Sequence, residues 1–225
     1  ELYHHDRIRK KIKYIILSTS TKYLIKKAET DFEQRKIGNG NVDVRLAYSQ
    51  NKKSYSKEDL RKHLGIDNQY PIVFIFAHVF RDSPHTSSEL LYCDYYDWLE
   101  NTLLYADKIK GINWIVKEHP SGEKIYKEKA VVNEILTKKK LSNIFLCPSE
   151  FNTNSIENTA DAVVTCQGTI GMECSCLGIP VVICGKAFYS GFGFTIEPKN
   201  VKQYRKILQE LNNVKKLNAS QVKKA

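Results

Sequence analysis

The sequence predicts an α/β protein built on a doubly wound parallel sheet, with a helical segment at its N-terminus. Five short runs of β-branched and aromatic residues occur along the chain, and they lack the polar alternation of a half-exposed strand. Runs of this kind are typical of strands that are buried on both faces. Stretches with helical periodicity separate most of the runs, and strands that alternate with helices form a parallel sheet covered by helices on both sides.

The N-terminal part is predicted to be helical over 7–36, because its isoleucines recur on one helical face. The glycines and asparagines of 38–41 end that pattern. Ser56 and Asp59 have the spacing of a capping-box variant, and Gly65 is suited to the C-terminal end of the short helix that follows.

The remaining elements follow in alternation. The expected strands are 71–77, 112–116, 144–146, 162–165 and 180–183. The expected helices are 90–109, 127–139, 154–160, 170–177 and 200–213. We divide the chain into a helical lead-in or linker (1–69), a Rossmann-like α/β domain (70–198) and a C-terminal helix with a basic tail (199–225).

Composition excludes several classes of protein. The 225 residues are 42% hydrophobic, which excludes a disordered chain. No stretch approaches the ~20 apolar residues of a transmembrane helix. The chain begins without methionine and without a signal-peptide pattern, so we interpret it as a piece of a longer protein.

The net charge of +10 is unevenly distributed. Residues 1–70 carry +7, residues 71–198 carry −4 and residues 199–225 carry +7. No nucleic-acid-binding motif accompanies the charge, and Lys138–Lys140 and Lys223–Lys224 are interpreted as a solvated helix end and a tail. We therefore expect no nucleic-acid partner, whereas the basic flanks suit anionic lipid headgroups or an anionic glycan.

The six cysteines predict free thiols rather than a metal site. No Cys-x-x-Cys pair occurs, and Cys174 and Cys176 lack a second pair of ligands. Most of the cysteines lie in apolar runs, so we expect buried thiols in a reducing cytosol and no bound metal.

Ligands of such sheets bind beyond the carboxyl ends of the strands, near the point where the strand order reverses. The first strand is followed by His78 and Arg81, and the second by Lys117, His119 and Pro120. Lys117 and His119 are two positions apart, so both can point the same way and offer positive charge and donors to a phosphate. A structural histidine and an ordinary loop remain the alternatives.

The turn after the fourth strand has the sequence Gln167-Gly168-Thr169 and leads into a helix that contains Glu173. A glycine at this place lets backbone N–H groups approach an anion at a helix N-terminus. A tight turn that merely requires glycine is the alternative. Tyr189 follows the fifth strand, and no P-loop, nucleophile elbow or zinc-protease motif occurs.

Four blocks of sequence together resemble bacterial capsule and surface-polysaccharide biosynthesis proteins, including GT-B glycosyltransferases of the capsular Kdo-transferase type. The blocks are Lys117–Pro120, Gly168–Glu173, Leu177–Val182 and Phe188–Thr195, and they occur in the order of the family. The resemblance covers about 70–198 and implies the Rossmann-like C-terminal half of a GT-B enzyme, which binds the nucleotide.

This resemblance also implies roles for particular residues. His119 would contact the nucleotide phosphate, Gly168 and Thr169 would form the small-residue turn, and Glu173 would bind the ribose. The block Tyr189–Thr195 departs from the Tyr-Ala-Gly-Trp-Gly-Leu-Thr pattern of the Kdo enzymes, so the resemblance does not imply Kdo as the sugar. The general base is expected on an acceptor-binding domain outside this chain.

We therefore predict the donor-binding half of a glycosyltransferase that uses a nucleotide-activated sugar, with a CMP-sugar favoured, and no further cofactor. Its partners would be the donor and a polysaccharide or lipid-linked acceptor, in the cytoplasm or at the inner face of the membrane. The alternatives are a CDP-alcohol-dependent transferase of the teichoic-acid type, a GT-B-shaped sugar-nucleotide epimerase and a non-catalytic polysaccharide-assembly module that docks on a membrane or a partner.

Overall fold

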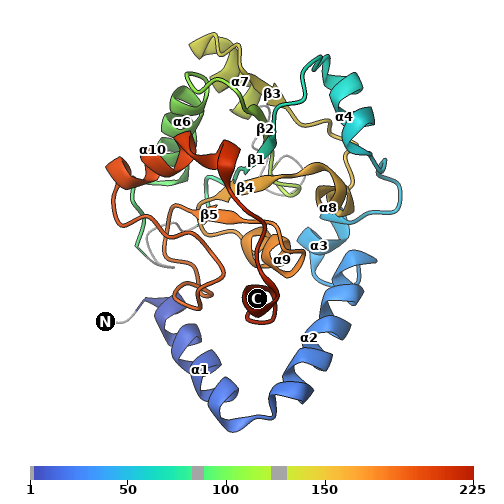
Figure 1. Ribbon diagram of the computed structural model, residues 1–225, viewed down its shortest axis with the longest axis vertical. Coiled ribbons are helices and arrows are strands. Elements are labelled where there is room, and N and C mark those ends of the chain that lie inside the picture. The colour runs from blue at the N-terminus through green and yellow to red at the C-terminus, as the bar shows by residue number, and fades with distance from the viewer. Residues whose placement is uncertain (1–2, 83–88, 123–130) are drawn as a thin grey trace.

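A five-stranded parallel sheet forms the centre of the protein, as the apolar runs predict. The structure, a computed structural model, describes residues 3–82, 89–122 and 131–225. The strands are β1 (Ile72–Phe76), β2 (Asn113–Lys117), β3 (Ile144–Leu146), β4 (Ala162–Thr165) and β5 (Val181–Ile183). All pair in parallel in the order β3-β2-β1-β4-β5, which confirms the doubly wound arrangement (Figure 1).

Helices cover both faces of this sheet. Val73 and Ile75 of β1 pack on one face and Ile72, Phe74 and Phe76 on the other, so each strand has no solvent-exposed side. The first face is covered by α6 (Tyr95–Ala106), α7 (Val131–Lys139) and α10 (Val201–Gln209). The second face is covered by α4 (Lys57–Leu64), α8 (Ile156–Thr159) and α9 (Ile170–Cys176).

The capping signals of the sequence are confirmed at α4. The Ser56 side chain accepts a hydrogen bond from the Asp59 N–H at 3.1 Å, which satisfies a donor of the first turn. At the other end Gly65 has a φ of 67°, a left-handed conformation that costs a glycine little.

Some predicted helix bounds are wrong. The helix expected from residue 90 begins at Tyr95, because the Asp94 side chain caps it by accepting from the Asp97 N–H at 2.8 Å. Leu90 instead forms an isolated bridge with Gly185. Residues 127–130 of the helix expected at 127–139 lie outside the described residues. Short elements complete the chain: η1 (Thr153–Ser155) before α8, then η2 (Leu211–Asn213) and α11 (Ala219–Val222).

The segment 7–36 is helical as expected, but it is divided into two helices, a break that the sequence did not predict. These are α1 (His4–Ser18) and α2 (Thr21–Lys36), and Thr19 between them has extended backbone. The run Ser18-Thr-Ser-Thr21 explains the break, because hydroxyl side chains compete for helical carbonyls, as Ser18 does for Tyr14 at 2.9 Å. Figure 1 shows α1 and α2 as the arms of a V that projects from the body, followed by α3 (Val42–Ala47).

The cysteines are free thiols, and Cys147, Cys166, Cys174 and Cys184 are buried as expected. Cys93 is exposed and Cys176 is half-buried, so the expectation of burial is wrong for Cys93. Across the described ranges, no helix combines the length and the apolar character needed to cross a membrane.

Candidate functional site

A cavity lies at the carboxyl ends of β1, β2 and β4, where the winding of the sheet reverses between β1 and β4. It encloses about 600 Å³ of space between protein atoms, part of it open to solvent, which is within the range of small-molecule sites. The residues with polar side chains that line it are Arg35, Asp43, Tyr48, His78, Lys117, His119, Thr153, Thr165, Thr169 and Glu173.

The end of β2 supplies a cationic wall. Lys117 is the last residue of the strand and is only 6% exposed. Among the residues that the structure describes, no carboxylate oxygen lies within 4.0 Å of its Nζ. A buried ammonium group of this kind needs an anion to compensate its lost hydration.

His119 is oriented by the loop that follows β2. Its Nδ1 accepts from the Ser121 N–H at 3.2 Å, which places the proton of the neutral ring on Nε2. Ser121 Oγ in turn donates to the Asp43 carboxylate, so α3 is tied to this loop. Pro120 also lines the cavity and fixes the backbone after His119.

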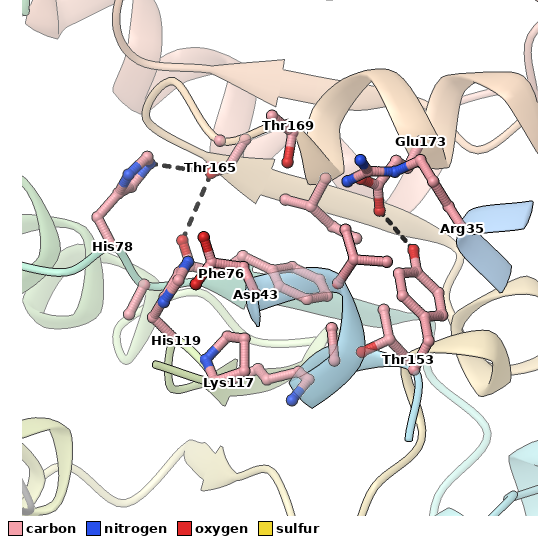
Figure 2. Close-up of a pocket in the computed structure, with 17 residues that line it drawn as sticks. Arg35, Asp43, Phe76, His78, Lys117, His119, Thr153, Thr165, Thr169 and Glu173 are labelled. Atoms are coloured by element: carbon pink, nitrogen blue, oxygen red, sulfur yellow. Dashed lines mark hydrogen bonds and ion pairs between the residues drawn. The ribbon is translucent and has the colours of Figure 1, made fainter. Parts of the chain in front are cut away.

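The end of β4 faces this wall. Figure 2 shows Thr165 and Thr169 across the cavity from Lys117 and His119. Thr169 is the N-cap residue of α9, and the Gly171 and Met172 N–H groups donate to the Gly168 and Thr169 carbonyls, each at 3.0 Å. A Cβ atom at Gly168 would lie 3.0 Å from Thr165 Oγ1, so the turn before α9 is tight enough to favour glycine.

His78, at the end of β1, holds that turn in place. Its Nε2 accepts from the Gln167 N–H at 3.1 Å, and its ring stacks on Tyr95 with the centroids 4.3 Å apart. Burial, with a smaller contribution from His119, lowers the pKa of His78 to about 3. The imidazole is therefore neutral at neutral pH and acts as an acceptor for the backbone.

Glu173 points into the cavity from α9 and is held by the N-terminal segment. Its carboxylate accepts from the guanidinium of Arg35, at the end of α2, and from the hydroxyl of Tyr48 (Figure 2). Burial and then the neighbouring Glu173 raise the pKa of Tyr48, so its hydroxyl keeps its proton and donates. The segment expected to be a linker therefore forms one side of the cavity.

Seven of the predicted site residues meet at this cavity: His78, Lys117, His119, Pro120, Gly168, Thr169 and Glu173. Gln167 and Tyr189 are buried behind it, and Tyr189 Oη donates to the Gly168 carbonyl at 2.6 Å. Arg81 is exposed and is not among the lining residues. Direct ligand binding by these three residues stays a prediction.

Arg35, Asp43, Tyr48 and Thr153 also line the cavity and had not been predicted from the sequence. Thr153 is the least expected, because its Oγ1 is buried in the wall without a hydrogen-bond partner among the described residues. Asn41 caps α3 by accepting from the Val44 N–H at 3.0 Å, so this short helix was detectable after the glycine-rich break. Its position beside β2 had no signal in the sequence.

Comparisons with known proteins agree with the fold. Residues 97–222 match the family model of capsule polysaccharide biosynthesis proteins. No curated protein sequence matches the chain significantly.

Two solved structures from Thermosulfurimonas dismutans are similar to this chain, both at 18% identity. The match to "KpsC, beta Kdo 2,7 transferase" covers 88% of this chain and 54% of the KpsC chain, with a TM-score of 0.50. The match to "KpsC, beta Kdo 2,4 transferase" covers 92% of this chain and 55% of the KpsC chain, with a TM-score of 0.52. The chain thus spans about half the length of either structure, and the likeness confirms the predicted α/β fold of GT-B type.

Proposed function

The chain belongs to the capsule polysaccharide biosynthesis protein family, and on that premise we propose that it is the donor-binding half of a glycosyltransferase. The donor is a nucleotide-activated sugar, with a CMP-sugar favoured, and the product is a growing capsular or surface polysaccharide. The observation that carries this proposal is Lys117, a buried residue that lines the cavity and has, among the residues that the structure describes, no carboxylate oxygen within 4.0 Å of its Nζ.

A nucleotide phosphate would supply the missing anion. The phosphate would lie between Lys117 and His119 on one side and, on the other, the Gly168-Thr169 turn at the positive end of α9. Charge-assisted hydrogen bonds from these donors are stronger than neutral ones. The binding energy of the donor would thus be concentrated on its phosphate.

The same groups would assist the reaction. An acceptor hydroxyl oxygen forms a bond to the anomeric carbon while the bond from that carbon to the phosphate oxygen breaks, and the phosphate leaves with the electron pair. Lys117 and the Nε2–H of His119 would stabilise the charge that develops on this leaving group. The acceptor proton passes to a general base, which we place outside this chain.

Glu173 would bind the ribose. A carboxylate has about four acceptor positions, and Arg35 and Tyr48 use two of them. The ribose hydroxyls would donate to the positions that remain. Arg35 and Tyr48 would hold the carboxylate in place for this contact, and Asp43 would position His119 through Ser121.

Calorimetric titration of the chain with CMP, CDP, UMP and UDP tests the proposal. We expect saturable binding with CMP as the tightest ligand, unchanged by EDTA because no metal takes part in our scheme. Tighter binding of CDP would favour a CDP-alcohol donor. No binding of any of the four nucleotides would overturn the donor-binding proposal.

The other proposed partners are a polysaccharide or lipid-linked acceptor and anionic lipid, with the protein in the cytoplasm or peripheral at the inner face of the membrane. The basic surplus of 1–70 supports the lipid contact.

A further inference from the structure

The V formed by α1 and α2 buries very few of its side chains. Arg9 is the one buried residue of α1, and α2 has none. Figure 1 shows the two arms diverging from their junction toward the body. Large apolar side chains are nevertheless exposed around that junction, namely Tyr14, Ile15, Ile16, Leu17 and Tyr23. We call these five residues the apolar tip.

The apolar tip is too exposed to serve the fold of this chain. Leu17 is 87% exposed, Tyr14 72% and Tyr23 60%. Isolated apolar side chains on a surface are ordinary, but a contiguous group at a projecting end marks a contact surface. Such a group therefore calls for a partner that buries apolar atoms.

The charge around the apolar tip identifies the chemistry of that partner. Between Arg7 and Lys27 the chain has eight basic residues and no acidic residue. Six of these are exposed lysines on the two arms: Lys10, Lys11, Lys13, Lys22, Lys26 and Lys27. A second copy of this surface would be repelled, whereas an anionic bilayer attracts the lysines and accepts the apolar side chains.

We infer that the apolar tip and the six lysines form the surface through which this protein binds an anionic membrane. At a rise of about 1.5 Å per residue, Lys10 lies roughly 10 Å along α1 from Leu17 and Lys26 roughly 8 Å along α2 from Thr21, while Lys13 and Lys22 lie nearer the tip and reach the headgroups by their long side chains. Apolar side chains of interfacial helices enter the bilayer by about 5–10 Å, and their lysines stay at the headgroups. The V therefore has the dimensions needed to insert its tip and keep its lysines at the headgroups.

Both arms are anchored, so bound lipid would orient the body. Arg9 Nη1 donates to the Ala187 carbonyl at 2.8 Å, and Asn154 Nδ2 donates to the Lys36 carbonyl at 2.9 Å. Arg35, which lines the cavity, is 14 residues along α2 from Thr21, or about 21 Å. This geometry would hold the cavity a fixed, short distance above the membrane, where a lipid-linked acceptor would be presented. The inference takes up the membrane contact of the proposed function and is independent of the nucleotide.

Vesicle co-sedimentation of the whole chain tests the inference. We expect binding to phosphatidylcholine vesicles that contain phosphatidylglycerol, little binding to pure phosphatidylcholine, and release in about 0.5 M salt. One variant replaces Lys10, Lys11, Lys22 and Lys26 by glutamine, and a matched control replaces the exposed tail lysines Lys215, Lys216, Lys223 and Lys224 by glutamine. The arm variant should lose more than tenfold in vesicle affinity, and the tail variant less than twofold.

A second variant, Leu17→Ser with Tyr23→Ser, keeps the charge and should also weaken vesicle binding more than tenfold. Circular dichroism and CMP titration of every variant show whether the body is intact. If CMP binds but vesicles do not, this inference alone fails. Equal loss in the arm and tail variants, or self-association through the apolar tip in the absence of vesicles, would also overturn it.

Discussion

The sheet and the V formed by α1 and α2 both carry patterned apolar residues, yet they place them in opposite environments. Every residue of β1, β2, β4 and β5 is buried. In α1 and α2 the isoleucines that share one helical face are half-buried or exposed. In the sheet the apolar pattern marks residues of the core. In the V it marks exposed residues, which we assign to a surface that binds a partner.

The two regions meet at the cavity, and this contact explains why the N-terminal segment is more than a linker. Arg35 comes from α2 of the V, buried Tyr48 follows α3 just after the V, and Glu173 comes from a helix of the packed sheet domain. Four experiments test how differently the two regions behave.

The largest effect is expected on the free energy of unfolding, when one leucine in each region is replaced by alanine. Leu99→Ala in α6 removes a side chain with no exposed surface and should lower the free energy of unfolding by about 2–5 kcal/mol. Leu17→Ala in α1 removes an 87% exposed side chain and should change it by less than about 0.5 kcal/mol. Urea denaturation of the two variants measures both values, and similar losses would show that the apolar tip is packed within the chain.

A second comparison uses the two ends of β2. Lys117→Ala removes the buried ammonium group at the cavity and should weaken CMP binding by about tenfold to a hundredfold. Lys110→Ala removes an exposed lysine that precedes the same strand, and CMP affinity should stay within about twofold. Calorimetric titration of the pair measures the difference, and equal affinities would remove Lys117 from the phosphate site.

Glu173→Gln tests the ribose contact, and its expected effect on nucleotide affinity is smaller. The wild-type chain should bind CMP about tenfold more tightly than 2′,3′-dideoxy-CMP, because the hydroxyls donate to a carboxylate. In the Gln variant this preference should shrink to about twofold. A preference that persists in the variant would place the ribose elsewhere.

The smallest effect is a pH dependence of stability. The folded pKa of His78 is about 3, below the usual 6.5, so between these values the unfolded chain binds the additional proton. The contribution of neutral His78 to the free energy of unfolding is therefore fully present above about pH 6.5. It is lost as the pH drops, by roughly 1 kcal/mol between about pH 6 and pH 5. His78→Gln should flatten this part of the unfolding profile, and an unchanged slope would assign the loss to other groups.

The sequence was sufficient for the sheet and for half of the site. Continuous apolar runs located all five strands, because strands buried on both faces need no alternation. Lys117 is the last residue of β2, and His119, Gly168 and Thr169 follow strand ends, which parallel strands bring to one edge.

The other half of the site depends on packing across the chain. Arg35 reaches Glu173 over 138 positions and Tyr48 reaches it over 125, and no local pattern marks either contact. The break after Ser18 was likewise missed, because the isoleucine periodicity of α1 outweighed the weak helix propensity of four hydroxyl residues.

A crystal structure of the chain with CMP bound tests the central claim most directly. We predict that the phosphate lies within hydrogen-bonding distance of Lys117 Nζ, of His119 Nε2 and of a backbone N–H at the start of α9. A phosphate bound elsewhere, with the cavity between β2 and β4 empty, would contradict the account.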